Sequence, residues 1–276
     1  MKKIKFAIVF LALISVVSCS KFLSEQNPTK YSISYIYSSP EGVKLAVNSL
    51  YSKFRDLLSD SSENCIWVAQ IRGTDLVTSN GGTGNFFGIY DPNYVKPSAS
   101  QVDFLWKNMY SIIGSCNEII NAASSMEQTD DVKTAIAEAM CFRAYSYLYL
   151  YRVFDRIWLN TEATTPENLN KERSFYPASQ AEVFDLIYSD LATAIKTLDW
   201  TSYQPGRWNQ AAARHLLAKS ALWIKDWKTA LAQVDTIDQS KEYRLVDVSE
   251  VFTGAKLNHD ESLMVMQWST DFGGSL

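Results

Sequence analysis

Histidine is scarce in this chain of 276 residues, and its scarcity limits the chemistry available to the protein. Only His215 and His259 occur, so a zinc site or a nucleophile–histidine triad has few groups to draw on. There is no Gly-x-Ser-x-Gly sequence, and the stretch GGTGNFFG lacks the lysine and the strand–helix frame of a phosphate-binding loop. We therefore expect no metal site and no cofactor.

Positive charge is not in excess either. The chain has 26 Lys and Arg against 30 Asp and Glu, a formal net charge of −4. Nucleic-acid binding needs a basic patch, so we expect no nucleic-acid partner. Paired carboxylates, which glycosidases use, have a simpler explanation at Asp130–Asp131, because acids that precede a helix cap it and suit its dipole. Asp260–Glu261 border a predicted strand with no second acidic pair in view. We expect no enzymatic activity.

The sequence has no uncharged run long enough to cross a membrane as a helix. Residues 6–17 carry no charge, proline or glycine, but this run of about 12 residues is shorter than the roughly 20 that a membrane span needs. It follows Lys2, Lys3 and Lys5, which is typical of a secretory signal peptide.

The residues after this run indicate lipidation. Val16 and Ser18 stand before Cys19, a pattern that resembles a bacterial lipobox, in which the cysteine thiol takes a diacylglycerol group and becomes the mature N-terminus. The alternative is an ordinary signal peptide with an incidental cysteine. We expect residues 1–18 to be removed, Cys19 to carry the lipid, and residues 19–38 to begin the mature chain as a tether.

Three further cysteines, Cys65, Cys116 and Cys141, cannot form a complete disulfide framework. Cys116 and Cys141 each lie on an apolar helical stripe, where a buried thiol acts as a small apolar side chain. A Cys65–Cys116 bridge remains an alternative.

Four segments have apolar residues at helical spacing, which predicts an all-α fold. The first begins with Ser39 as N-cap and Pro40 at the first helical position; the others cover about 101–124, 130–153 and 179–198, the last with Ser179 as its cap. Their apolar stripes are Val43, Val47, Leu50, Phe54 and Leu57; Leu105, Met109, Ile112, Cys116 and Ile119; Val132, Ile136, Ala139, Arg143, Tyr147 and Leu150; and Val183, Ile187, Leu191 and Leu198.

Residues 206–237 predict an antiparallel helix pair with a turn at 225–227. Small and apolar residues stand at the offsets of a tetratricopeptide unit, which needs neighbours to stack against: Leu217, Ala218, Ala221, Ala230 and Val234. His215 lies within this pair, where a packed or surface role is commoner than a ligand role. The apolar run in 261–269 predicts a short strand, so we expect tetratricopeptide-like repeats with long loops and minor β content.

The stretch 71–100 is long, rich in glycine and aromatic residues, and without helical or strand period, as functional loops often are. Sugar recognition combines flat aromatic faces with polar groups for the hydroxyls, and this loop supplies both. The candidates are Phe86, Phe87, Tyr90 and Tyr94, and the polar Asp75, Asn80, Asn85 and Asn93. The alternatives are that the aromatic residues anchor the loop to the helices and that Asp75 caps the turn after Gly73.

The order of these segments resembles the SusD/RagB family of outer-membrane nutrient-binding lipoproteins of Bacteroidetes. The resemblance covers nearly the whole chain: CSKFLSEQNPT at the lipidated start, LWKNMYSIIGSCNEII with Trp106, Tyr110 and Asn117, AEAMCFRAYSYLYLYRVFDRIWL with Glu138, Ala139, Arg143, Ala144 and Tyr147, ASQAEVFDLIYSDLATAIKTL, and GRWNQAAARHLLAKSALWIKDWKTAL. Two features depart from the family. Phe154-Asp155 replaces the usual Phe-Gly, and the chain stops where the family's second half would begin, so we expect residues 39–276 to form the N-terminal portion of the family fold.

What the resemblance implies is a surface lipoprotein of the cell outer membrane that binds glycans and passes them to a SusC-type TonB-dependent transporter. Its partners would be that transporter, the glycan and, through acylated Cys19, outer-membrane lipid. The alternative is a helical-repeat scaffold that binds a protein partner without a sugar site of its own. A surface-anchored enzyme is a third hypothesis, which would need glycan turnover that depends on one Asp or Glu.

Overall fold

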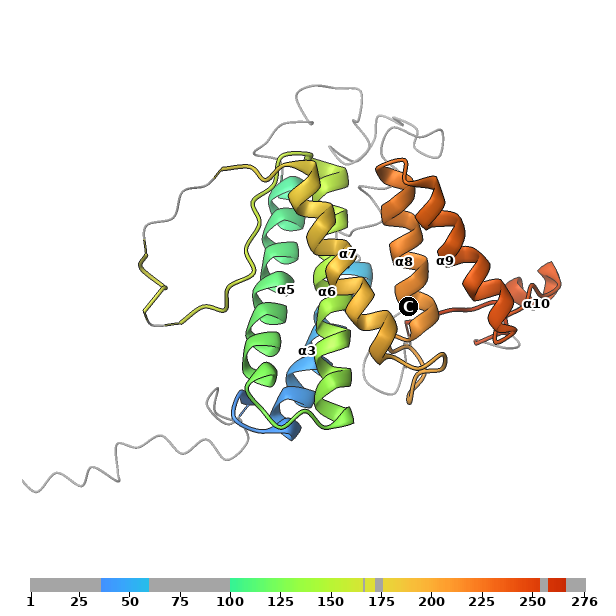
Figure 1. The fold of residues 1–276 in the computed structure, drawn as a ribbon, viewed down its shortest axis with the longest axis horizontal. Helices are drawn as coiled ribbons and strands as arrows, with labels where there is room; N and C mark the ends of the chain where they lie inside the picture. Colours follow the sequence, from blue (N-terminus) through green and yellow to red (C-terminus); the bar gives the residue numbers. More distant parts are fainter. Residues whose placement is uncertain (1–35, 60–99, 166, 172–175, 254–257, 267–276) are drawn as a thin grey trace, which may run out of the picture. The chain divides into compact units, whose positions relative to one another are not determined.

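The computed structural model describes residues 36–59, 100–165, 167–171, 176–253 and 258–266, and within them every regular element is a helix (Figure 1). This confirms the predicted all-α class. The elements in chain order are α3 (Pro40–Ser59), α5 (Ser100–Ser124), α6 (Asp130–Phe154), α7 (Gln180–Thr197), α8 (Gln210–Trp223), α9 (Trp227–Ser240) and α10 (Val248–Phe252).

Side-chain caps mark where the helices begin. Ser39 accepts a hydrogen bond from the backbone N–H of Gly42 at 3.1 Å. Ser179 and Glu182 form a reciprocal capping box at the start of α7, as the sequence suggested for Ser179. At α6 the N-cap is Thr129, and Asp130 and Asp131 lie in the first turn, where negative charge suits the helix dipole.

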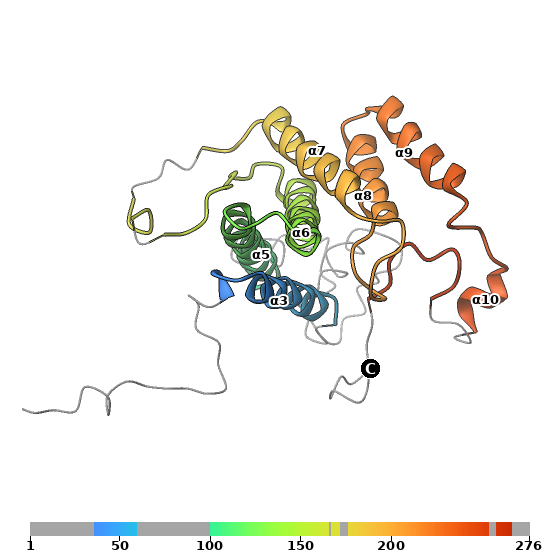
Figure 2. The same ribbon diagram turned by 60° about the horizontal axis from the view of Figure 1, so that its bottom comes forward.

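Helix α6 is the centre of the packing. It contacts α3, α5, α7 and α8, and its residues are buried on nearly every side. Figure 1 shows α5, α6 and α7 side by side with α8 and α9 following, and Figure 2 shows α3 packed beneath α5 and α6. Successive helices from α3 to α9 are therefore neighbours in space, as stacked helical repeats require.

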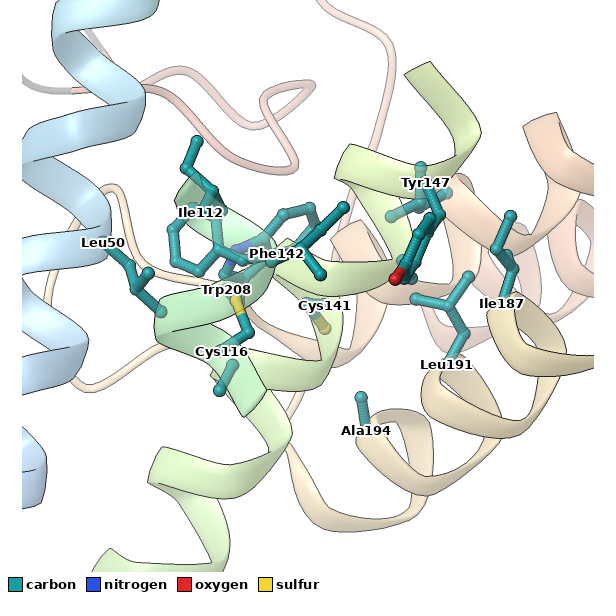
Figure 3. Close-up of a cluster of buried hydrophobic side chains, with 14 of the residues drawn as sticks. Leu50, Ile112, Cys116, Cys141, Phe142, Tyr147, Ile187, Leu191, Ala194 and Trp208 are labelled. Atoms are coloured by element: carbon teal, nitrogen blue, oxygen red, sulfur yellow. The ribbon is translucent and has the colours of Figure 1, made fainter. Parts of the chain in front are cut away.

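The apolar stripes predicted from the sequence form the core. All the stripe residues of α3, α5 and α7 are buried, and so is Leu198 after α7. The stripe residues of α6 are also buried, except Ile136, which is partly buried. Figure 3 shows side chains from α3, α5, α6 and α7 meeting in one cluster, which Trp208 joins from the segment before α8. Phe142 packs edge-to-face against Trp208 and Tyr51, with ring centroids 5.7 and 4.7 Å apart. Burial of these large side chains stabilises the fold by about 1.5–3 kcal/mol each.

The α8–α9 pair also forms as predicted. Ala218, Ala221 and Ala230 are buried, and Lys225 adopts a positive φ of 64° in the turn between the helices. Val234 differs, because 51% of its surface is exposed on the outer side of α9.

The prediction of a strand in 261–269 is wrong for the residues that the structure describes. Residues 261–266 form no strand and pair with no other backbone as a ladder. Met264 and Met266 instead pack against the helical core. An apolar segment can bury its side chains against helices without pairing with a neighbouring strand. The apolar run in the sequence was therefore not sufficient evidence for a strand.

Candidate functional site

The residues that the sequence singled out for function lie outside the described residues. They are Cys19 and the loop residues Asp75, Asn80, Asn85, Phe86, Phe87, Tyr90, Asn93 and Tyr94. In the sequence, the candidate loop falls between the end of α3 at Ser59 and the start of α5 at Ser100. These two helices pack against each other and against α6.

A buried ion pair joins α6 to α7. The Nε and Nη2 atoms of Arg143 donate hydrogen bonds of 2.8 and 2.7 Å to the two carboxylate oxygens of Asp190. Burial alone would lower the pKa of Arg143, but the Asp190 carboxylate raises it and keeps the guanidinium charged. The Nη1 atom of Arg143 donates to Asn117 Oδ1 on α5 at 2.8 Å, so one side chain ties three helices together.

A second buried ion pair joins α6 to the segment before α8. Arg207 donates from Nε and Nη2 to the Glu138 carboxylate at 2.8 and 2.5 Å, and from Nη1 to Asn48 Oδ1 on α3 at 2.7 Å. The guanidinium lies between two rings, 4.5 Å from the centroid of Tyr51 and 4.7 Å from that of Tyr203. Burial, and then the Glu138 charge, raise the pKa of the Tyr51 phenol.

Tyrosine hydroxyls hold the chain that follows α6. The Tyr110 hydroxyl both donates to the carbonyl and accepts from the N–H of Trp158, and Tyr147 does the same at Asn160. Asn117 donates to the Asn160 carbonyl at 2.8 Å. The sequence marked Tyr110 and Asn117 only as family positions and Tyr147 also as an apolar stripe residue, and the structure shows that all three hold this segment.

An apolar cavity of about 470 Å³ opens beside the end of α3. Phe54 and Leu58 form one wall, α8 a second, and Met264 and Met266 a third. His215 lines it with a solvent-exposed side chain, which agrees with the expected packed or surface role rather than a ligand role. Burial, and then the nearby Lys219 charge, lower the pKa of His215, which keeps its imidazole neutral.

A smaller polar cleft of about 280 Å³ lies next to this cavity, with Met266 in the wall of both. Asn48, Ser52 and Arg55 line it from α3, and residues 204–207 line it from the segment before α8. Arg207 is one of its lining residues, and its ion pair with the buried Glu138 holds the guanidinium in place.

The two described cysteines are free thiols in the core. Cys116 and Cys141 are both fully buried, and Figure 3 shows them within the apolar cluster. Cys65, the other half of the alternative Cys65–Cys116 bridge, lies outside the described residues, while Cys116 is a free thiol. Burial raises the pKa of both thiols, so they remain protonated and act as small apolar side chains. Within the described residues, no cluster of three His, Cys, Asp or Glu side chains can hold a metal ion, and no described helix is long and apolar enough to span a membrane.

With the fold in place, comparison with known proteins decides the family. A family model described as "Starch-binding associating with outer membrane" matches residues 22–222, most of the chain. The chain belongs to the SusD-like family. Members of this family bind carbohydrate.

Similar sequences agree with this assignment. A SusD-like protein of Bacteroides ovatus is 25% identical over 97% of this chain and 50% of its own length. SusD-like protein P38 of Formosa agariphila is 25% identical over 89% of this chain and 48% of its own length. The chain thus spans about half the length of the curated relatives that it matches.

Solved structures share the fold. A laminarin-binding SusD-like protein superposes with a TM-score of 0.64 at 21% identity, over 77% of this chain and 49% of that one. A SusD-like carbohydrate-binding protein from Bacteroides fragilis gives a TM-score of 0.62 at 22% identity, over 76% of this chain and 42% of that one. At these identities the likeness establishes the fold alone.

Proposed function

We propose that this SusD-like protein is a lipid-anchored protein of the cell outer membrane that binds glycans and passes them to a SusC-type TonB-dependent transporter. The observation that carries the proposal is the family match over residues 22–222, which includes α3, the candidate loop and every helix through α7. The role is binding without hydrolysis, because capture and transfer need only reversible contacts with the sugar.

The described helices suit the task of presenting a binding loop. Two buried charge clusters, Arg143–Asp190–Asn117 and Arg207–Glu138–Asn48, fix α3, α5, α6 and α7 relative to one another. Binding residues are often found on loops that a rigid scaffold carries. We place the sugar contacts on Phe86, Phe87, Tyr90 and Tyr94, with Asp75, Asn80 and Asn85 for the hydroxyls.

The experiment that tests glycan binding is an array of oligo- and polysaccharides probed with the mature chain, residues 19–276. The proposal expects retention of a restricted group of glycans, together with the helical circular-dichroism spectrum of a folded protein. A folded chain that binds no glycan on the array would reject glycan binding by this chain.

Lipid attachment and the transporter partner are tested in cells. Radiolabelled palmitate should enter the wild-type protein and not a Cys19→Ser variant, and only the wild type should sediment with outer membranes. Purification of the wild type from mildly solubilised outer membranes should bring along a TonB-dependent transporter. An unlabelled wild-type chain in the soluble fraction would reject the anchor.

One observation favours the alternative of a scaffold for a protein partner. Trp227, Leu231 and Val234 expose 62, 61 and 51% of their surfaces along α9. Contiguous exposed apolar residues of this kind mark interaction surfaces. A chain that binds a protein through this face and no glycan would fit the scaffold function.

A further inference from the structure

We propose that the polar cleft between α3 and residues 204–207 is a subsite for a carboxylate-bearing sugar, a uronic acid unit of the bound glycan. The inference rests on the proposed glycan-binding function and adds a substrate class to it. The cleft holds about 280 Å³, close to the lower end of the range for small-molecule pockets, which suits one sugar ring.

Three polar side chains of α3 face the cleft in one line. Asn48, Ser52 and Arg55 lie four and three residues apart, so they share one side of the helix. Gln204 lines the opposite wall. Among the interactions of the described residues, the Ser52 hydroxyl and the side-chain amide of Gln204 have no hydrogen-bond partner. The Asn48 amide uses its oxygen for Arg207 and leaves its NH₂ group for another acceptor. These groups are the donors and acceptors that sugar hydroxyls need.

Charge distinguishes this cleft from the rest of the surface. Its described lining includes two arginines and no carboxylate, in a chain whose formal net charge is −4. The charge of Arg207 is neutralised by Glu138, whose carboxylate accepts hydrogen bonds from two nitrogens of the guanidinium. Among the described residues, Arg55 has only a 3.7 Å contact with the neighbouring Asp56, and both side chains are solvent-exposed. An exposed contact of this kind is weak, so Arg55 remains available to a ligand anion.

The chemistry of the two arginines sets their roles. Arg207 is held between Tyr51 and Tyr203 and by three hydrogen bonds to Glu138 and Asn48, so it supports the cleft and keeps Asn48 in place. The guanidinium of Arg55 presents a planar fork of N–H donors, which matches a carboxylate through two parallel hydrogen bonds. A neutral sugar offers Arg55 no such partner. The cleft therefore favours uronates over neutral sugars.

The test compares uronate and neutral oligosaccharides of equal length by isothermal titration calorimetry on the mature chain. The probes are oligomers of galacturonate, glucuronate and mannuronate, with maltotetraose and laminaritetraose as neutral comparisons. We expect at least one uronate to bind more tightly than either neutral probe, with an affinity that falls as salt rises. Arg55→Gln should weaken that binding by about tenfold or more, and Arg55→Lys should restore little of it, because lysine cannot make the bidentate contact.

Lys44→Gln is the matched control, since Lys44 is an exposed cation of α3 outside the cleft. It should leave the affinity unchanged. Uronates that bind no better than neutral probes, or an Arg55→Gln variant with wild-type affinity, would overturn the subsite. Tight binding of a neutral glycan with no effect of Arg55 would reject the subsite and keep the proposed function, whereas a chain that binds no sugar rejects both.

Discussion

Arg143 on α6 and Asp190 on α7 form a two-pronged ion pair in the interior, with side chains only 7 and 3% exposed. Such a pair costs desolvation energy when it forms, but removing one member leaves the other as an unpaired buried charge. Arg143 also donates a hydrogen bond to Asn117 on α5, so the same side chain connects a third helix to the ion pair. The pair therefore specifies how α5, α6 and α7 meet.

Replacing Asp190 by Ala should lower the free energy of unfolding by about 3–5 kcal/mol, because the Arg143 charge stays buried without its partner. The double variant Arg143→Met/Asp190→Leu should lose much less, since it buries no charge. Urea denaturation followed by circular dichroism measures both. Asp103→Ala is the control: it breaks an exposed ion pair with Lys107 and should cost about 0.5 kcal/mol or less. A loss below about 1 kcal/mol in Asp190→Ala would show that the pair is not structural.

The stability of the fold should depend on pH through His215. Burial and the Lys219 charge lower the pKa of His215 in the folded state below its usual 6.5. The unfolded chain then binds the proton more tightly, so this histidine favours unfolding as the pH falls below about 6.5 and has no effect above it. The melting temperature of the wild type should fall further between about pH 7 and pH 5 than that of His215→Gln. His259→Gln is the control, because His259 lies in a turn away from the cavity. Parallel curves for the wild type and His215→Gln would contradict this role.

The close approach of α8 and α9 depends on Ala230, which is only 5% exposed. Leucine at this position overfills the interface and should cost about 1–3 kcal/mol of unfolding free energy. Ala232→Leu adds the same atoms on the exposed side of α9 and should change stability little. Thermal unfolding of the two variants compares them directly. Equal stability would mean that the helices are not held at the distance seen here.

The helices were predictable because their signals are local. Ser39, Ser179 and the apolar stripes identify where the helices begin and which sides are buried, and both depend only on nearby residues. The ion pairs were not predictable, since Arg207 and Glu138 are 69 residues apart and no local pattern links them. One signal was present in the stripe of α6: Arg143 occupies an apolar position, and a charge there needs a buried partner.

The errors have a common cause. A strand in 261–269 was predicted, and Val234 was grouped with the small residues of the helix pair, from local sequence character alone, whereas burial is decided by what packs against the residue. The polar cleft also escaped sequence analysis, because α3 and residues 204–207 meet only in the fold. Asn48 and Arg55 carry no mark in the sequence that separates them from ordinary surface residues.

The central claim, that the candidate loop carries the glycan site, is tested most directly by affinity gel electrophoresis with a glycan retained on the array. The mature wild type is compared with the triple variant Phe86→Ala/Phe87→Ala/Tyr90→Ala. Tyr176→Ala is the control, because Tyr176 is an aromatic residue that is 79% exposed in a different loop. The account predicts that the glycan slows the wild type and Tyr176→Ala but not the triple variant, while all three keep the same helical spectrum. A folded triple variant slowed as strongly as the wild type would contradict it.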